Sequence, residues 1–119
     1  MARTEITVND VDRDGIEEVA GLSSDMTNGM FFTGNDGNVE LQIENTDSVS
    51  RWVDIVASPT YTADGLTVVN LRHTIPAGEI WRFGPYKVAT FRQNPDNDVY
   101  INPEVNTMLK LAAYRRLPA

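Results

Sequence analysis

Cysteine is absent from the 119 residues, and histidine occurs once, as His73. Without cysteine the chain has no disulfide, no thiolate nucleophile and no zinc site built on sulfur. A single histidine cannot form a histidine pair or a multi-histidine metal site within one chain. The sequence also has no phosphate-binding loop, dinucleotide fingerprint or nucleophile elbow. We therefore expect a protein that is not an enzyme and needs no cofactor.

Positive charge is the second feature in short supply. Ten Lys and Arg residues against 17 Asp and Glu residues give a net charge of −7. A field of that sign repels phosphate backbones and anionic lipid, so neither nucleic acid nor a membrane is an expected partner. Apolar runs of the length of a signal-peptide core or a membrane span are also missing. We expect the protein to act without export through a signal-peptide route.

What the chain does have is turn-forming residues at the spacing typical of a β protein. Gly, Pro, Asn and Asp recur about every ten residues, and short segments rich in Val, Ile, Thr and aromatic residues lie between them. The clearest strand is 39–45, where Val39, Leu41 and Ile43 alternate with polar residues. Residues 52–57 follow after a turn, so these two segments predict an antiparallel pair.

Short strands at regular spacing define the expected fold. The further segments with strand character are 5–8, 30–33, 65–71, 79–83, 88–91, 99–101 and the C-terminal segment. Eight or nine short strands without helical patterns between them predict an all-β fold: an antiparallel two-sheet β-sandwich, jelly-roll-like, formed by residues 1–119 as a single domain.

The C-terminal segment leaves two alternatives open. Asn102 and Pro103 have the signature of a helix start, and good helix formers follow them. Against a helix, Leu109, Leu111 and Ala113 can line one face of a last strand. The strand is the favoured interpretation.

Residues 9–28 form the most polar stretch and are expected to be a long acidic loop, which makes them a candidate contact arm. Within this loop Asp10, Asp12 and Asp14 match the first half of an EF-hand calcium loop, because alternating carboxylates can point inward toward one cation. The match fails at the twelfth position, where Gly21 stands in place of a bidentate glutamate. A solvated acidic loop is favoured, and a calcium site is the alternative.

Aromatic side chains offer another candidate site. Flat rings can stack on sugars, and the residues available for such a platform are Trp52, Trp81, Tyr61, Tyr86 and Tyr100. Packing in the core or at an interface is favoured for most of them, because both tryptophans lie beside apolar neighbours within strands.

Several segments together resemble one known family. They are Met1 to Val8, Asn28-Gly29, Val39 to Thr46, Ile75 to Glu79, Phe83 to Tyr86 and Ala113 to Pro118. They look like the small head decoration, or capsid cement, proteins of tailed phages, and the resemblance runs nearly end to end. It implies a virion structural protein, made in the host cytoplasm, that binds the outer capsid surface between major capsid subunits. The implied partners are the major capsid protein and further copies of the chain, a trimer being favoured.

Residues at both ends of the chain are candidates for partner binding. Residues 1–8 can act as an N-terminal arm that adds a strand to a neighbouring subunit, and the basic C-terminus can meet an acidic capsid surface. The candidate partner-binding residues are Arg3, Glu5, Ile6, Val8, Arg115 and Arg116.

Two other functions fit the same composition. A tail, neck or fibre-associated phage sandwich would share every feature described above. A carbohydrate-binding β-sandwich would instead present an exposed pair of aromatic rings and bind sugar without a protein partner.

Overall fold

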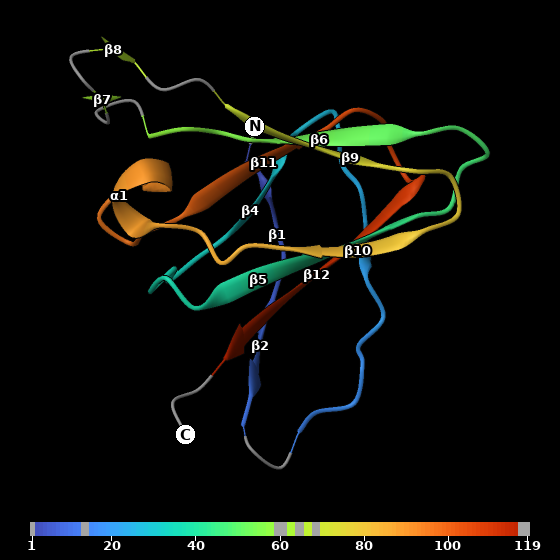
Figure 1. The fold of residues 1–119 in the computed structure, drawn as a ribbon, viewed down its shortest axis with the longest axis horizontal. Coiled ribbons are helices and arrows are strands. Elements are labelled where there is room, and N and C mark those ends of the chain that lie inside the picture. The colour runs from blue at the N-terminus through green and yellow to red at the C-terminus, as the bar shows by residue number, and fades with distance from the viewer. Residues whose placement is uncertain (1, 13–14, 59–61, 64–65, 68–69, 117–119) are drawn as a thin grey trace.

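The computed structural model describes residues 2–12, 15–58, 62–63, 66–67 and 70–116. Within these residues the chain forms twelve strands and one short helix (Figure 1). In chain order they are β1 (Thr4–Glu5), β2 (Val8–Val11), β3 (Leu22–Ser23), β4 (Met30–Phe32), β5 (Val39–Asn45), β6 (Arg51–Ile55), β7 (Thr62–Ala63), β8 (Leu66–Thr67), β9 (Leu71–Ile75), β10 (Ile80–Phe83), α1 (Val88–Phe91), β11 (Val99–Pro103) and β12 (Leu109–Arg116).

Ten of these strands form two five-stranded sheets. Sheet A has the order β1-β4-β11-β6-β9. Sheet B has the order β10-β5-β12-β2, and β3 shares with β2 the edge of β12 that β5 leaves free. Figure 1 shows β6, β9 and β11 of sheet A above β5, β10 and β12 of sheet B. The predicted all-β, two-sheet sandwich is confirmed.

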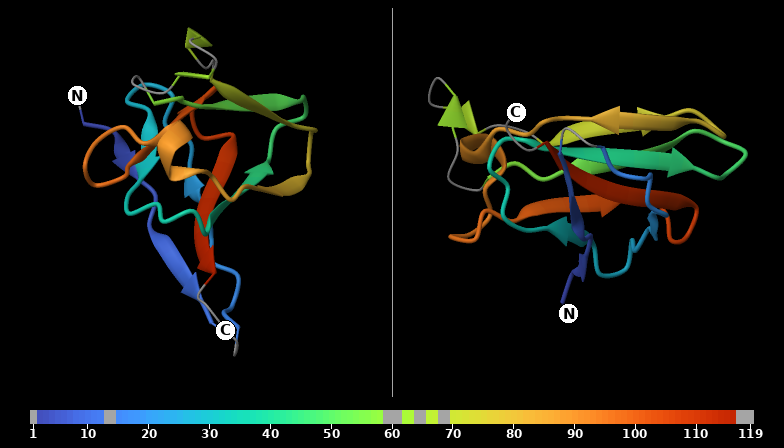
Figure 2. Two further views of the ribbon diagram at one scale, coloured as in Figure 1. Left: turned by 60° about the vertical axis from the view of Figure 1, so that its left-hand side comes forward. Right: turned by 90° about the horizontal axis from the view of Figure 1, so that it is seen from below.

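The two sheets are mixed rather than purely antiparallel, because of the N-terminal strands. β1 runs parallel to β4 in sheet A, and β2 runs parallel to β12 in sheet B. Figure 2 shows β2 running beside the end of β12. Between these strands the chain crosses the sandwich at Ile6, which is 2% exposed and belongs to the core. The N-terminal segment therefore joins both sheets of its own chain.

The predicted pairing of residues 39–45 with 52–57 is wrong, although both segments form strands. β5 pairs with β10 and β12 in sheet B, whereas β6 pairs with β9 and β11 in sheet A. The turn between them carries the chain from one sheet to the other. Buried Asn45 organises this turn, since its Nδ2 donates to the carbonyl oxygens of Val49 and Ile75, both at 2.9 Å.

Residues 88–91 form helix α1, so the strand predicted there is wrong. Helical spacing places Val88 and Phe91 on one face, and Phe91 packs edge-on against Tyr86 with ring centroids 5.4 Å apart. The carbonyl oxygen of Thr90 accepts a hydrogen bond from the backbone N–H of Ser58 at 2.7 Å. Tertiary packing thus overrides the β preference of the local sequence.

The strand predicted over residues 65–71 falls partly outside the described residues. Within the described part, Leu66–Thr67 pairs with Thr62–Ala63 as a hairpin, and Leu71 begins β9. At the C-terminus the favoured strand is confirmed, because Leu109–Arg116 forms β12 in the interior of sheet B. The alternative helix is wrong.

The core fills the space between the sheets. Strands β5 and β11 alternate strictly between buried and half-buried residues, as expected when one face of each strand is dry. The fully buried side chains of the two inner faces include Met30, Phe32, Leu41, Ile43, Val53, Ile55, Ile101 and Leu109. Burying each of them contributes about 1.5–3 kcal/mol. The outer faces of the sheets are then left for other roles.

Candidate interaction face

The acidic residues singled out for calcium lie at the end of β2. Asp10 is part of the strand, stands opposite Arg115 in β12, and lies 3.6 Å from Arg115 Nη1 through its Oδ1. A calcium loop would need Asp10 in a turn, whereas here its backbone is extended. Asp12 follows the strand, and Asp14 lies outside the described residues. Among the described residues, no three His, Asp or Glu side chains form a group suited to a metal ion.

The candidate arm is engaged within its own chain. Arg3 and Glu5 reach the outer face of sheet A, Ile6 lies in the core, and half-buried Val8 begins β2. The six partner-binding candidates are therefore not brought together at one place. Residues 2–8 thus pack against their own chain.

The basic residues of β12 form a separate corner. Arg115 Nη2 donates to the carbonyl oxygen of Gly34 at 2.6 Å, and Arg115 Nε lies 3.5 Å from Asp36 Oδ2. Arg116 Nη2 lies 3.7 Å from the carboxylate oxygen Oε2 of Glu40, yet the Arg116 side chain is 73% exposed. Arg115 thus links β12 to residues 34–36, and Arg116 remains exposed to solvent.

The aromatic platform suggested by the sequence is not assembled as a unit. Tyr86 is buried, burial raises the pKa of its phenol, and its hydroxyl lies 3.0 Å from Nε2 of His73. Trp81 is 45% exposed on β10, at the edge of sheet B. Trp52 and Tyr100 lie on the outer face of sheet A, and Tyr61 lies outside the described residues.

The outer face of sheet A instead carries a set of side chains that the sequence did not connect. Their buried neighbours along each strand point into the core, so these side chains point away from it. We call them the interaction face, and they are Arg3, Glu5, Phe31, Trp52, Asp54, Arg72, Tyr100 and Asn102. Strand pairing places Tyr100 opposite Phe31.

A row of polar side chains crosses this face from one edge of the sheet toward the other. Asn102 stands opposite Asp54, and Asp54 stands opposite Arg72. Arg3 Nη1 donates to Asn102 Oδ1 at 2.7 Å. At the other end, Arg72 Nε and Nη2 donate to the two carboxylate oxygens of Asp54 at 2.8 and 3.0 Å. The row is ordered by contacts within the chain itself.

Both arginines of the row also stack on aromatic rings. Arg3 Cζ lies 4.1 Å from the centroid of the Tyr100 ring, and Arg72 Cζ lies 3.8 Å from that of Trp52. Each contact is a cation–π interaction, worth about 0.5–1 kcal/mol at an exposed site. One face of each ring is thus occupied by a guanidinium group.

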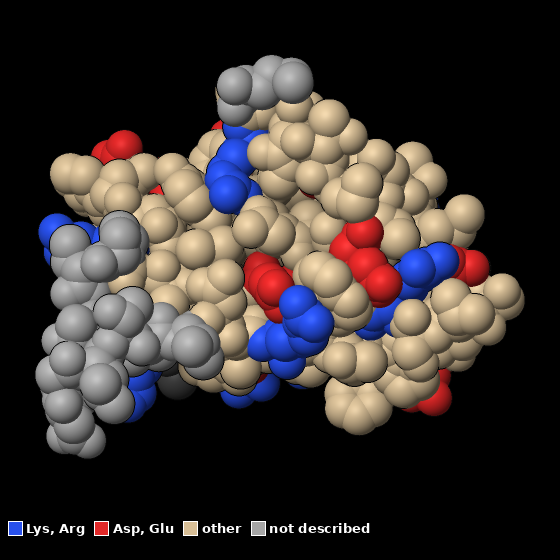
Figure 3. All heavy atoms as spheres, turned by 90° about the horizontal axis from the view of Figure 1, so that it is seen from above, with Lys and Arg blue, Asp and Glu red and all other residues tan. Residues whose placement is uncertain are grey.

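This side of the molecule carries charged side chains of both signs. Figure 3 looks onto the molecule from above in the view of Figure 1, over sheet A, and shows acidic and basic side chains next to one another in small groups. Arg3, Arg72, Asp54 and Glu5 lie on the outer side of sheet A, and Glu104 lies close enough to Arg72 to interact with its charge.

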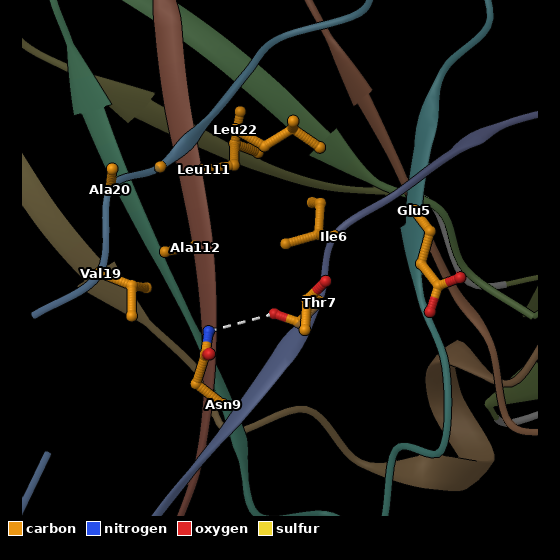
Figure 4. Close-up of a pocket in the computed structure, with 10 residues that line it drawn as sticks. Glu5, Ile6, Thr7, Asn9, Val19, Ala20, Leu22, Leu111 and Ala112 are labelled. Atoms are coloured by element: carbon orange, nitrogen blue, oxygen red, sulfur yellow. Dashed lines mark hydrogen bonds between the residues drawn. The ribbon is translucent and has the colours of Figure 1, made fainter.

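Cavities border the segment between β2 and β3. One of about 290 Å³ lies between residues 5–9 and residues 19–22, against Leu111 and Ala112 of β12. Figure 4 shows its mainly aliphatic lining, with Asn9 Nδ2 donating to the carbonyl oxygen of Thr7 at 3.3 Å.

Compared with known proteins, the chain matches no family model, no curated sequence and no solved structure. The described residues contain no helix that is long and apolar enough to cross a membrane. What the chain does is therefore inferred from its own residues.

Proposed function

We propose that this chain is a non-enzymatic virion structural protein that decorates and stabilises a capsid, binding its outer surface between major capsid subunits. The observation that carries the proposal is the interaction face on sheet A. Tryptophan, tyrosine and arginine supply most of the binding energy at protein interfaces, and Trp52, Arg72, Arg3 and Tyr100 lie together there. The resemblance of the sequence to head decoration proteins supplies the partner.

Rigidity of this face favours a protein partner. The arginine side chains are held by stacking and hydrogen bonds before any partner arrives. Side chains that are already ordered lose less conformational entropy on binding, so more of the contact energy appears as affinity. A five-stranded sheet beneath them keeps their spacing fixed.

A sugar is a poorer fit to the same face. Sugar stacking needs a bare aromatic ring, but the rings of Trp52 and Tyr100 each have a guanidinium over one face. Trp81 is more exposed, yet it lies on β10 of the other sheet and its Nε1 donates to Glu79 Oε1 at 2.8 Å. The protein-binding function is thus favoured over a carbohydrate-binding module.

Contacts between copies are part of the proposal, with a trimer favoured. β10 is an edge strand of sheet B, and an edge strand presents unpaired backbone groups to a neighbour. Ile80 and Trp81 on β10 are both large, apolar and exposed. This edge is separate from the interaction face, so one copy can contact both a capsid and another copy.

Co-sedimentation with undecorated phage heads tests the proposal. Saturable binding in a fixed ratio to capsid subunits supports decoration, whereas no binding would overturn it. Recovery in tails would favour a tail, neck or fibre-associated sandwich, and binding to a glycan array would favour the carbohydrate-binding function. Trp52→Ala should weaken head binding at least tenfold, about 1.4 kcal/mol. Val49→Ala, an exposed apolar residue in the turn after β5, is the matched control.

A further inference from the structure

Arg3 is an ordered arginine whose charge is not met by a carboxylate. Its Nη1 donates to two neutral oxygens, Asn102 Oδ1 at 2.7 Å and the carbonyl of Met30 at 3.3 Å. Among the described residues, no ion pair joins Arg3 to an Asp or Glu. The arginines that do form such pairs are Arg51, Arg72, Arg82, Arg115 and Arg116. In a chain with a net charge of −7, an ordered arginine without an acidic partner needs a reason.

One neighbour packs against the Arg3 guanidinium, and another leaves room for it. Tyr100 stacks beneath it, 4.1 Å from Cζ to the ring centroid. Gly29 leaves the space beside it open, because a Cβ built on Gly29 would collide with Arg3 Nη1. Gly29 also has φ of +74°, a conformation that favours glycine. The group is thus fixed by its neighbours in the chain.

We propose that Arg3 is the docking point for an Asp or Glu side chain of the partner protein, flanked by the rings of Tyr100 and Phe31. A guanidinium fits a carboxylate through two parallel N–H···O bonds. This rests on the proposed function, since the partner is the protein that the chain decorates. It adds the chemistry of the contact: an acidic side chain of the partner binds beside the Tyr100 ring at the β1 edge of sheet A.

The charged side chains at and beside Arg3 determine how strongly this site attracts a carboxylate of the partner. Glu5 is exposed on the same face and stands opposite Phe31, so it repels an incoming carboxylate that approaches from its side. Arg3 provides the attraction and Glu5 the opposing field. Removing the charge of Arg3 should therefore weaken binding, and removing the charge of Glu5 should strengthen it.

Titration with a blocked glutamate, followed by NMR, tests the chemistry without the natural partner. Increasing concentrations of N-acetyl-glutamate N-methylamide at constant ionic strength should progressively shift the Arg3 Nε–Hε resonance, and the blocked glutamine should not. Arg92 is exposed, and its resonance in the same spectrum serves as the internal control that shifts less. A stationary Arg3 resonance, or equal shifts with both probes, overturns the proposal.

Binding to undecorated heads tests the contact in place. Arg3→Gln should weaken binding about tenfold, the loss expected for a charge-assisted hydrogen bond, while Glu5→Gln should strengthen it. Arg92→Gln removes the same charge at another exposed site and should leave binding unchanged. Equal losses for Arg3→Gln and Arg92→Gln would mean that net charge alone matters, which overturns the docking point. If the unaltered protein does not bind heads, the decoration function fails, and the NMR titration still decides the role of Arg3.

Discussion

The imidazole of His73 lies flat against the ring of Phe83, with ring centroids 3.8 Å apart and ring planes inclined by 10°. His73 belongs to β9 of sheet A and Phe83 to β10 of sheet B, so this stack bridges the two sheets along one edge of the sandwich. Tyr86 lies behind it and shares a hydrogen bond with His73 Nε2 at 3.0 Å. His73 is thus both packed and hydrogen-bonded at this edge.

Protonation of His73 should destabilise the fold. Burial lowers its pKa in the folded state, so the unfolded chain binds the proton first. Stability is fully present above about pH 6.5, the ordinary histidine pKa, and declines as the pH falls from there through the folded pKa. Urea unfolding at about pH 5.5 and 7.5 measures the difference. His73→Phe keeps a ring on Phe83 and should flatten this dependence, and an unchanged slope would contradict the assignment.

Asn45→Ala should cost about 1–3 kcal/mol of unfolding free energy, because it leaves the buried carbonyl oxygen of Ile75 without the hydrogen bond that Asn45 Nδ2 donates. Denaturant unfolding midpoints at constant slope give the value. Asn38→Ala, at an exposed position, is the control and should change stability by less than about 0.5 kcal/mol. Equal effects at both positions would show that Asn45 does not organise the turn.

Gly21→Ala should loosen the segment before β3. A Cβ at Gly21 would lie 2.7 Å from Lys110 Cβ and 2.9 Å from the backbone nitrogen of Leu111, and the backbone of β12 cannot yield. We expect a loss of about 1–3 kcal/mol and faster amide exchange at Leu22, which pairs with Leu111. The exposed neighbour Ala20, changed to serine, is the control. Preserved protection at Leu22 would argue against a tight contact.

Calcium should bind weakly or not at all near β2. Binding by Asp10 would require it to leave the strand and its ion pair with Arg115. Calorimetry with millimolar calcium should give no saturable heat, and the melting temperature should not move. Saturable heat that disappears in Asp12→Asn would restore the calcium loop as the better interpretation.

Strands with a strong alternating pattern were predictable from the sequence. Val39–Asn45 forms a strand with the bounds expected, because one face is apolar at every second residue. Strands of two residues, such as Thr4–Glu5 and Leu22–Ser23, raise the total to twelve, and segments this short show no period. Residues 88–91 were ambiguous for a related reason, since Val88 and Phe91 fit a helical face as well as a strand.

The candidate site could be predicted only in part. Arg3 and Glu5 were singled out, but as an arm reaching another subunit rather than as part of a face. The side chains that complete the face, such as Asn102 and Tyr100, come from β11, nearly the whole chain away. Alternation shows that Trp52 and Asp54 point outward, but it does not show which strands are neighbours. That information lies in the long-range pairing of strands, which a single sequence does not reveal.

The positions of β11 and β12 have a consequence for how the chain is made. β11 lies between β4 and β6, and β12 lies between β5 and the pair β2 and β3, yet they follow every other described strand in sequence. Neither sheet can become continuous until residues 99–116 have emerged from the ribosome. Until then β4 and β6 lack their partner strand β11, and β5 lacks its partner β12. Unpaired apolar strands of this kind are prone to aggregate. We therefore expect the two sheets to form as one unit, only after residues 99–116 have been made.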